Sequence, residues 1–216
     1  MRIILAGATG LVGRSLLERL CTSPEVTAIT LVGRRSAGVE HPKVIERIGP
    51  ADQWPTLLEG QGGDVAMSAL GTTIADAGSQ DAFFAVDHDA VLAFARATCA
   101  AGAAQFLMVS SVGAHAASRN FYLATKGKVE ASVDQVGFHR VDILRPGLLR
   151  GRRQGRLRLG ERIAIALSPV TDFLTPAVLA RYRSIRSTQV ARALHQLAGA
   201  KESGTFVHHN EDMLAL

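Results

Sequence analysis

The chain has 216 residues, of which 47% are hydrophobic and 20% are charged, and its formal net charge is +5. These proportions are ordinary for a soluble globular protein, and the length suits one domain with a substantial core. No apolar run reaches the roughly 20 residues that cross a bilayer, so no membrane association is expected. Aromatic residues make up only 5% of the chain, which disfavours a surface that stacks nucleic-acid bases. An anionic small ligand explains the positive charge at least as well.

The two cysteines, Cys21 and Cys99, lie far apart and lack the spacing of metal ligands. No signal peptide is expected, because Arg2 is followed by only a few apolar residues before the first glycine. These features predict a reducing, cytoplasmic location. His88 lies between two aspartates, but consecutive helical residues do not face one site, so no metal site is predicted.

Short aliphatic runs alternate with helical patterns along the chain. The runs predict strands, the last of them weakly, over Arg2–Ala6, Ala28–Val32, Val44–Arg47, Val65–Ser68, Phe106–Ser110, Asp142–Arg145 and Gly204–Val207. Helices are predicted over Leu11–Cys21, Gln80–Ala101, Asn120–Gln135 and Thr188–Leu197. Several strands are apolar throughout, as expected where helices cover both faces of a sheet. The alternation predicts an α/β fold with a doubly wound parallel sheet.

One domain is expected over residues 1–216, with a dinucleotide-binding core over residues 1–150. After Pro146 the alternation weakens and arginines become frequent. Residues 151–216 are therefore predicted to form a small C-terminal cap on the substrate side. The arginines between Arg150 and Arg162 fit a clamp for an anionic substrate, a clamp for a protein or nucleic-acid partner, or a solvated loop beside the active site.

The stretch "GATGLVG" follows the first strand and opens the first helix. In this setting Gly7 permits a tight turn, Gly10 lets the main chain approach a pyrophosphate, and Gly13 lets the helix pack closely on the sheet. The helix N-terminus adds free N–H donors and the positive end of its dipole. The pattern predicts a dinucleotide site, against the plainer alternative of glycines that serve packing alone.

Arg34 and Arg35 follow the second strand, where NAD-preferring sites carry an acidic residue. A guanidinium can hold a 2′-phosphate with two hydrogen bonds and stack on adenine. The sequence therefore predicts NADP(H) in preference to NAD(H), with Arg34 as the more direct contact. The alternative is a pair of solvated loop arginines.

Ser111, Tyr122 and Lys126 form a second group. Ser111 follows a strand, and Tyr122 and Lys126 are four residues apart, one turn of a helix. An ammonium group next to a phenol favours the phenolate. The tyrosine could then exchange a proton with a substrate carbonyl that the serine orients while a cofactor exchanges hydride. The alternative is an exposed helical tyrosine with an unrelated lysine.

The motifs "GATGLVG", "SALGTT", "VSSVGA", "YLATKGKVE" and "ILRPGLL" together resemble the short-chain dehydrogenase/reductase superfamily of NAD(P)-binding Rossmann proteins. More narrowly, they are similar to its atypical branch of Tat-interacting oxidoreductase-like and epimerase/dehydratase-like proteins. The resemblance covers Met1 to about Arg150. The chain is shorter than typical sugar-nucleotide epimerases of that superfamily.

The resemblance implies a role for each matching residue. It implies that the pyrophosphate lies against Gly7, Thr9, Gly10, Leu11 and Val12, and the 2′-phosphate against Arg34 and Arg35. It implies that Ala69, Leu70 and Gly71 line the ribose region. It implies nicotinamide-side contacts from Tyr122, Lys126, Pro146, Gly147 and Leu148, and a catalytic triplet of Ser111, Tyr122 and Lys126.

The expected function is hydride transfer between NADP(H) and a small carbonyl or alcohol. Two alternatives remain open: a non-catalytic NADPH-binding sensor or scaffold, and an epimerase or dehydratase that holds its cofactor tightly. By analogy with the superfamily, helices Gln80–Ala101 and Asn120–Gln135 could pair in a homodimer.

Overall fold

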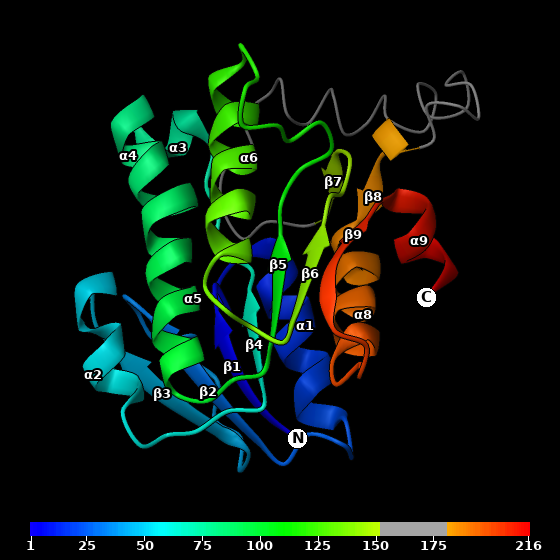
Figure 1. Ribbon diagram of the computed structural model, residues 1–216. Helices are drawn as coiled ribbons and strands as arrows, with labels where there is room; N and C mark the ends of the chain where they lie inside the picture. Colours follow the sequence, from blue (N-terminus) through cyan, green and yellow to red (C-terminus); the bar gives the residue numbers. More distant parts are fainter. Residues whose placement is uncertain (152–180) are drawn as a thin grey trace.

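The computed structural model describes residues 1–151 and 181–216, and it is built on a parallel seven-stranded sheet (Figure 1). The strands are β1 (Arg2–Ala6), β2 (Ala28–Gly33), β3 (Val44–Ile48), β4 (Val65–Ser68), β5 (Gln105–Val109), β6 (Arg140–Leu144) and β9 (Gly204–His208). Their order across the sheet is β3-β2-β1-β4-β5-β6-β9, and every neighbouring pair is parallel. The predicted doubly wound α/β fold, the Rossmann fold, is confirmed.

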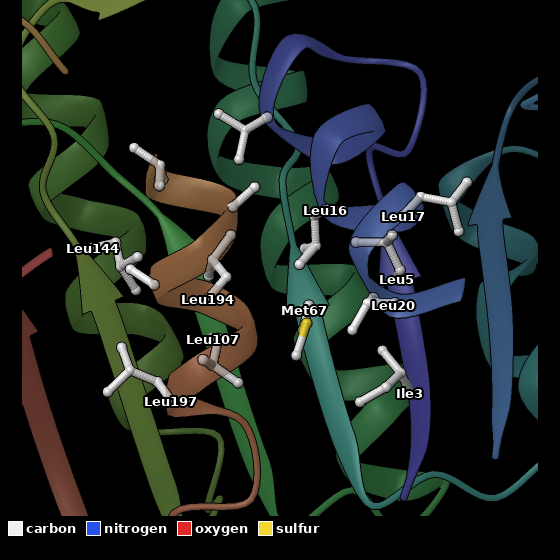
Figure 2. Packing of buried hydrophobic residues seen from close by; sticks show 14 of the residues in the cluster. Ile3, Leu5, Leu16, Leu17, Leu20, Met67, Leu107, Leu144, Leu194 and Leu197 are labelled. Carbon is white, nitrogen blue, oxygen red and sulfur yellow. The ribbon is translucent and has the colours of Figure 1, made fainter. Parts of the chain in front are cut away.

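Helices cover both faces of this sheet. On one face lie α1 (Leu11–Thr22) and α8 (Ser187–Leu197), and on the other lie α2 (Trp54–Leu58), α5 (Val91–Ala100) and α6 (Phe121–Asp134). Side chains of β1 alternate between the two cores: Ile3 and Leu5 pack under α1 and α8, whereas Ile4 and Ala6 face α2, α5 and α6. Figure 2 shows the first of these cores. Burial on both sides explains why the strands are apolar throughout.

The long helix predicted over Gln80–Ala101 is interrupted. The structure has α4 (Gln80–Phe84), a π-helical segment η2 (Ala85–Ala90) and then α5. A π-helical turn fits an extra residue into the helix and changes the direction of the side chains around it. Here it accompanies the complete burial of Asp87. Sequence periodicity did not reveal this irregularity.

The predicted separation of a C-terminal cap from residue 151 is wrong for residues 181–216. Strand β9 pairs with β6 along its length and completes the main sheet, and α8 packs against α1 within one hydrophobic cluster. Strand β9 lies at an edge and is mostly solvent-accessible, so its sequence carries little apolar signal. Arg152 to Arg162, together with the rest of residues 152–180, lie outside the described part of the chain.

A buried polar network at Asp142 attaches β9 and the loop before it. The Asp142 carboxylate accepts hydrogen bonds from Gln105 Nε2 at 2.6 Å, Arg140 Nε at 2.7 Å and His208 Nε2 at 2.9 Å. Burial by itself would raise the pKa of Asp142. Hydrogen bonds from His208, Arg140 and Gln105 outweigh burial and hold that pKa below its ordinary value. The ionised carboxylate thus ties β5, β6 and β9 together.

Several short elements were not predicted. They are η1 (Ala51–Gln53), α2 (Trp54–Leu58), α3 (Ile74–Ala77), β7 (Leu149–Arg150), β8 (Ile185–Arg186) and α9 (Asn210–Ala215). Each spans six residues or fewer, too short for a periodic hydrophobic pattern. In the described ranges, none of the helices combines the length and apolar character needed to cross a membrane.

Candidate dinucleotide-binding and catalytic site

The glycine turn between β1 and α1 forms one wall of the site. Gly7 has a φ of +84°, and a Cβ there would lie 2.4 Å from the backbone of Ala69. A Cβ on Gly13 would lie 2.1 Å from the Gly7 carbonyl oxygen. Both glycines are therefore required by the contact of this turn with β4 and α1. Gly10 is different, since its nearest contact would be 3.3 Å away and the residue is exposed.

Helix α1 presents its N-terminus to this turn. It begins at Leu11 with Gly10 as the N-cap, a residue without a side chain that could satisfy the first N–H groups. Those donors and the positive end of the helix dipole form an environment suited to a phosphate. The side chain of Val12 is buried in the core and that of Leu11 packs near Gly151. These two residues can therefore contribute backbone groups but not side chains to a nucleotide.

Substitutions of Gly13 and Gly10 test two roles of glycine in this turn: Gly13 in packing and Gly10 in ligand binding. Gly13→Ala places a methyl group against the Gly7 carbonyl and should lower the free energy of unfolding by about 3 kcal/mol, at the upper end of overpacking costs. Gly10→Ala should leave that free energy within about 1 kcal/mol, because only a small shift is required. Gly10→Ala should nevertheless weaken NADPH binding, which calorimetric titration measures. Full NADPH affinity in folded Gly10→Ala would contradict the assignment of this turn to the pyrophosphate.

A cavity of about 430 Å³ opens beside the turn, within the range of small-molecule sites. It lies at the carboxyl ends of β1, β2 and β4, where the chain order of the sheet reverses and where such folds bind ligands. Of the residues predicted to bind the cofactor, those that line it are Gly7, Thr9, Gly10, Arg34, Arg35, Ala69, Leu70 and Gly71. The structure thus brings three separate sequence motifs into one cavity.

Two arginines lie at the β2 end of this cavity. Arg34 and Arg35 are both exposed, and within residues 1–151 and 181–216 neither forms an ion pair. Glu46, from β3, also lines the cavity and accepts a hydrogen bond from the Ala37 N–H at 2.8 Å. Glu46 was not among the predicted site residues, because it is close to the arginines only through the pairing of β2 with β3.

Lys126 is buried beside the other end of the cavity. Its Nζ lies 2.7 Å from Asp87 Oδ1, and the two side chains are 6% and 0% exposed. The second oxygen of Asp87 accepts a hydrogen bond from the Thr72 N–H at 2.8 Å. A Cβ on Gly71, which lines the cavity, would lie 3.8 Å from Lys126 Nζ. Asp87 therefore joins α6 (Phe121–Asp134) to the loop that follows β4.

The role of Asp87 was not predicted. The only signal in the sequence is a charged group, "DHD", inside a mostly apolar helix. The direction of its side chain depends on the π-helical segment, which periodicity does not reveal.

Tyr122 lies on α6, one turn before Lys126. The helix begins after Asn120, whose side-chain oxygen accepts the Leu123 N–H at 3.1 Å. The ring of Tyr122 is half-buried and lies 5.4 Å from the ring of Phe83 between centroids. Ring packing and the N-cap fix the direction of the tyrosine side chain.

Ser111 follows β5 in a loop that is attached to α6. The His115 N–H donates to the Leu123 carbonyl at 3.2 Å, and a Cβ on Gly127 would lie 2.2 Å from the nitrogen of Ala116. The Ser111 hydroxyl donates to the adjacent Val112 carbonyl at 3.3 Å, a long hydrogen bond. A substrate oxygen could replace that acceptor.

The predicted nicotinamide-side residues lie next to the Ser111 loop. The Val112 N–H donates to the Pro146 carbonyl at 3.0 Å, and the Gly147 N–H donates to Asn210 Oδ1 at 3.0 Å. Leu148 is 47% exposed. None of the three predicted residues Pro146, Gly147 and Leu148 lines the 430 Å³ cavity, and the same is true of Ser111, Tyr122 and Lys126. Two of the six have a recorded link to the cavity or to the Ser111 loop: Lys126 lies beside Gly71 of the cavity lining, and the Pro146 carbonyl accepts the Val112 N–H.

Comparison with known proteins places the chain in a family. A protein-family model described as "Semialdehyde dehydrogenase, NAD binding domain" matches residues 2–116. Protein FMP52, mitochondrial, of Meyerozyma guilliermondii is 41% identical over 158 residues, covering 71% of this chain and 67% of that protein. Protein FMP52, mitochondrial, of Coccidioides immitis is 33% identical over 214 residues, covering 93% of this chain and 87% of that protein.

These relatives contradict the predicted cytoplasmic location, because they are named as mitochondrial proteins. The prediction rested on two separated cysteines, both of which are free in the structure. Free cysteines indicate a reducing environment and do not identify which compartment supplies it.

Solved structures share the fold. MoeE5 in complex with UDP-glucuronic acid and NAD superimposes with a TM-score of 0.72 at 16% identity, covering 96% of this chain and 75% of that one. UDP-glucose 4-epimerase from Thermus thermophilus in complex with NAD gives a TM-score of 0.70 at 16% identity, covering 100% and 82%. A short-chain dehydrogenase/reductase superfamily protein from Agrobacterium tumefaciens with bound NAD gives 0.68, also at 16% identity, covering 100% and 80%.

At these identities the structural likeness shows the fold alone, whereas the family match and the FMP52 relatives show descent. The chain belongs to the family of the FMP52 proteins, and its residues 2–116 form an NAD-binding domain of the semialdehyde dehydrogenase type.

Proposed function

We propose that the protein is an NADP(H)-dependent oxidoreductase that reduces or forms a small carbonyl compound. One observation carries this proposal: the cavity that has Arg34 and Arg35 at one end has the buried Lys126 beside its other end, one helical turn from Tyr122. A dinucleotide that spans this cavity would bring its reactive ring toward the tyrosine.

The residues around the cavity fit NADP(H). The pyrophosphate would lie at Gly10 and the first N–H groups of α1, where Gly10 leaves space for a close approach. The 2′-phosphate would lie at Arg34 and Arg35, whose guanidinium groups can each donate two hydrogen bonds. The loop from Ala69 to Gly71 would border the ribose.

In the proposed reaction, the cofactor would supply the hydride and the protein side chains would handle the proton. When bound, NADPH would supply a hydride to the carbonyl carbon. Tyr122 gives its phenolic proton to the carbonyl oxygen, so that the products are the alcohol and the oxidised cofactor, and the reverse reaction returns the proton to the phenolate. The Lys126 ammonium stabilises the phenolate, and Asp87 holds that ammonium in place. The Ser111 hydroxyl orients the carbonyl oxygen.

Nucleotide preference tests the assignment of the arginines. The protein should bind NADPH at least about tenfold more tightly than NADH, since one hydrogen bond to a charged group contributes roughly 1.5–3 kcal/mol. Arg34→Ala should remove most of this preference by weakening NADPH binding alone. Arg14→Ala is the matched control, because Arg14 is exposed on α1 and does not line the cavity. Equal affinities of the wild-type protein for the two nucleotides would contradict NADP(H) specificity.

Turnover separates this function from the alternatives. NADPH absorbance should fall when a panel of aldehydes and ketones is added to the protein. Tight NADPH binding without consumption over the whole panel would favour a sensor or scaffold. Oxidised cofactor that stays bound through purification, with no net consumption, would favour epimerase or dehydratase chemistry.

A further inference from the structure

Glu46 is an unexpected carboxylate in the cavity that we assign to NADP(H). It lies on β3 opposite Leu31 of β2 and lines the same cavity as Arg34 and Arg35. The negative charge of Glu46 would repel a bound 2′-phosphate. A carboxylate at this position therefore needs another function that offsets this repulsion.

The carboxylate attaches the turn that carries the two arginines. Glu46 Oε1 accepts the Ala37 N–H at 2.8 Å, and the pair is partly buried. The side chain of Ala37 packs against the hydrophobic cluster under α1 and α8. Next to it, Gly38 has a φ of +66° and donates its N–H to Ser36 Oγ at 2.9 Å. The turn after β2 is therefore held at Ala37 by both a hydrogen bond and apolar packing.

The arginines themselves have no comparable anchor. Arg34 and Arg35 are exposed and form no ion pair within the described ranges, and a free arginine side chain has many rotamers. Their direction is set by the backbone that carries them. A turn fixed two residues further on, at Ala37, limits where both guanidinium groups can point.

We infer that Glu46 is a positioning residue for nucleotide specificity: by accepting the Ala37 N–H it holds Arg34 and Arg35 at the cavity and thereby favours NADP(H) over NAD(H). This inference rests on the proposed function. Glu46 would act through the turn rather than by contact with the 2′-phosphate. The competing role is direct: a carboxylate that accepts hydrogen bonds from the ribose hydroxyls of NAD(H).

Two substitutions in the full chain distinguish these roles. Glu46→Gln keeps an oxygen that can accept the Ala37 N–H and removes the negative charge, so NADPH affinity should stay the same or rise. Glu46→Ala removes the acceptor, so the dissociation constant for NADPH should rise about tenfold, comparable to the loss of one charge-assisted contact. The dissociation constant for NADH should change less than about twofold in both variants. Calorimetric titration gives all four values.

The control is Glu40→Ala. It removes an exposed carboxylate from the loop between β2 and β3, and Glu40 does not line the cavity. Its affinities should match the wild-type protein. Melting temperatures without nucleotide show that each variant is folded. A purely structural role would lower the melting temperature of Glu46→Ala without changing its ratio of NADPH to NADH affinity.

Each outcome has one meaning. An unchanged affinity ratio in Glu46→Ala overturns the inference, as does loss of NADH binding in both Glu46 variants, which would assign the carboxylate to the ribose. A wild-type protein without NADPH preference overturns the proposed function itself, and the inference with it. When the wild-type protein prefers NADPH and Glu46→Ala keeps the same ratio, the inference fails and the proposed function stands.

Discussion

Tyr122→Phe should abolish turnover and leave the protein folded with its cofactor bound. Loss of the phenolic hydroxyl removes the group that we propose to exchange a proton with the substrate, which should lower kcat by about 10²–10⁴-fold. The phenylalanine ring retains the contact with Phe83, so the melting temperature should hardly change. Steady-state NADPH oxidation and calorimetric titration measure the two effects separately.

Tyr182→Phe is the matched control for this experiment. The chain has two tyrosines, and Tyr182 is 47% exposed near β8. The same loss of a hydroxyl there should leave kcat within about twofold, because no proton transfer is assigned to it. Undiminished turnover in Tyr122→Phe would refute the proposed acid/base role.

Asp87→Asn should destabilise the protein. Removing one partner of a buried ion pair typically costs about 3–5 kcal/mol, because the remaining charge is left without compensation. The asparagine also has one acceptor oxygen for the two donors, Lys126 Nζ and the Thr72 N–H, that Asp87 now serves. The free energy of unfolding from urea titration should fall accordingly, and NADPH oxidation should slow as Lys126 loses its fixed position.

Asp89→Asn, two residues away, is the matched control for Asp87→Asn. Asp89 contacts His88 at 2.8 Å, and its side chain is 61% exposed. Asp89→Asn makes the same chemical change at a solvated position, where an ion pair contributes at most about 1 kcal/mol. Equal losses of unfolding free energy in the two variants would show that the pair of Asp87 with Lys126 does not stabilise the fold.

Much of the fold could be predicted because its signals are local. The strands of the parallel sheet are continuous apolar runs, and "GATGLVG" indicates by itself the strand, the turn and the start of α1. The order of the first six strands across the sheet follows from the usual doubly wound arrangement. The family model that matches residues 2–116 confirms the NAD-binding Rossmann domain that these motifs indicated.

What could not be predicted depends on contacts between distant segments. Asp87 reaches Lys126 only because η2 and α6 pack together, although the two residues are far apart in the sequence. Glu46 meets the turn after β2 only through strand pairing. Strand β9 pairs with β6, and its His208 contacts the polar network at Asp142, whose partners are spread over three strands. No spacing rule in the sequence signals these contacts.

The assignment of the cavity to NADP(H) is the claim on which the chemistry depends. Calorimetric titration of the full chain with NADPH tests it most directly. The account predicts saturable heat with one nucleotide bound per chain, and clearly weaker binding of NADH under the same conditions. Absence of heat with NADPH up to millimolar concentrations, in protein shown to be folded by its melting curve, would contradict the account.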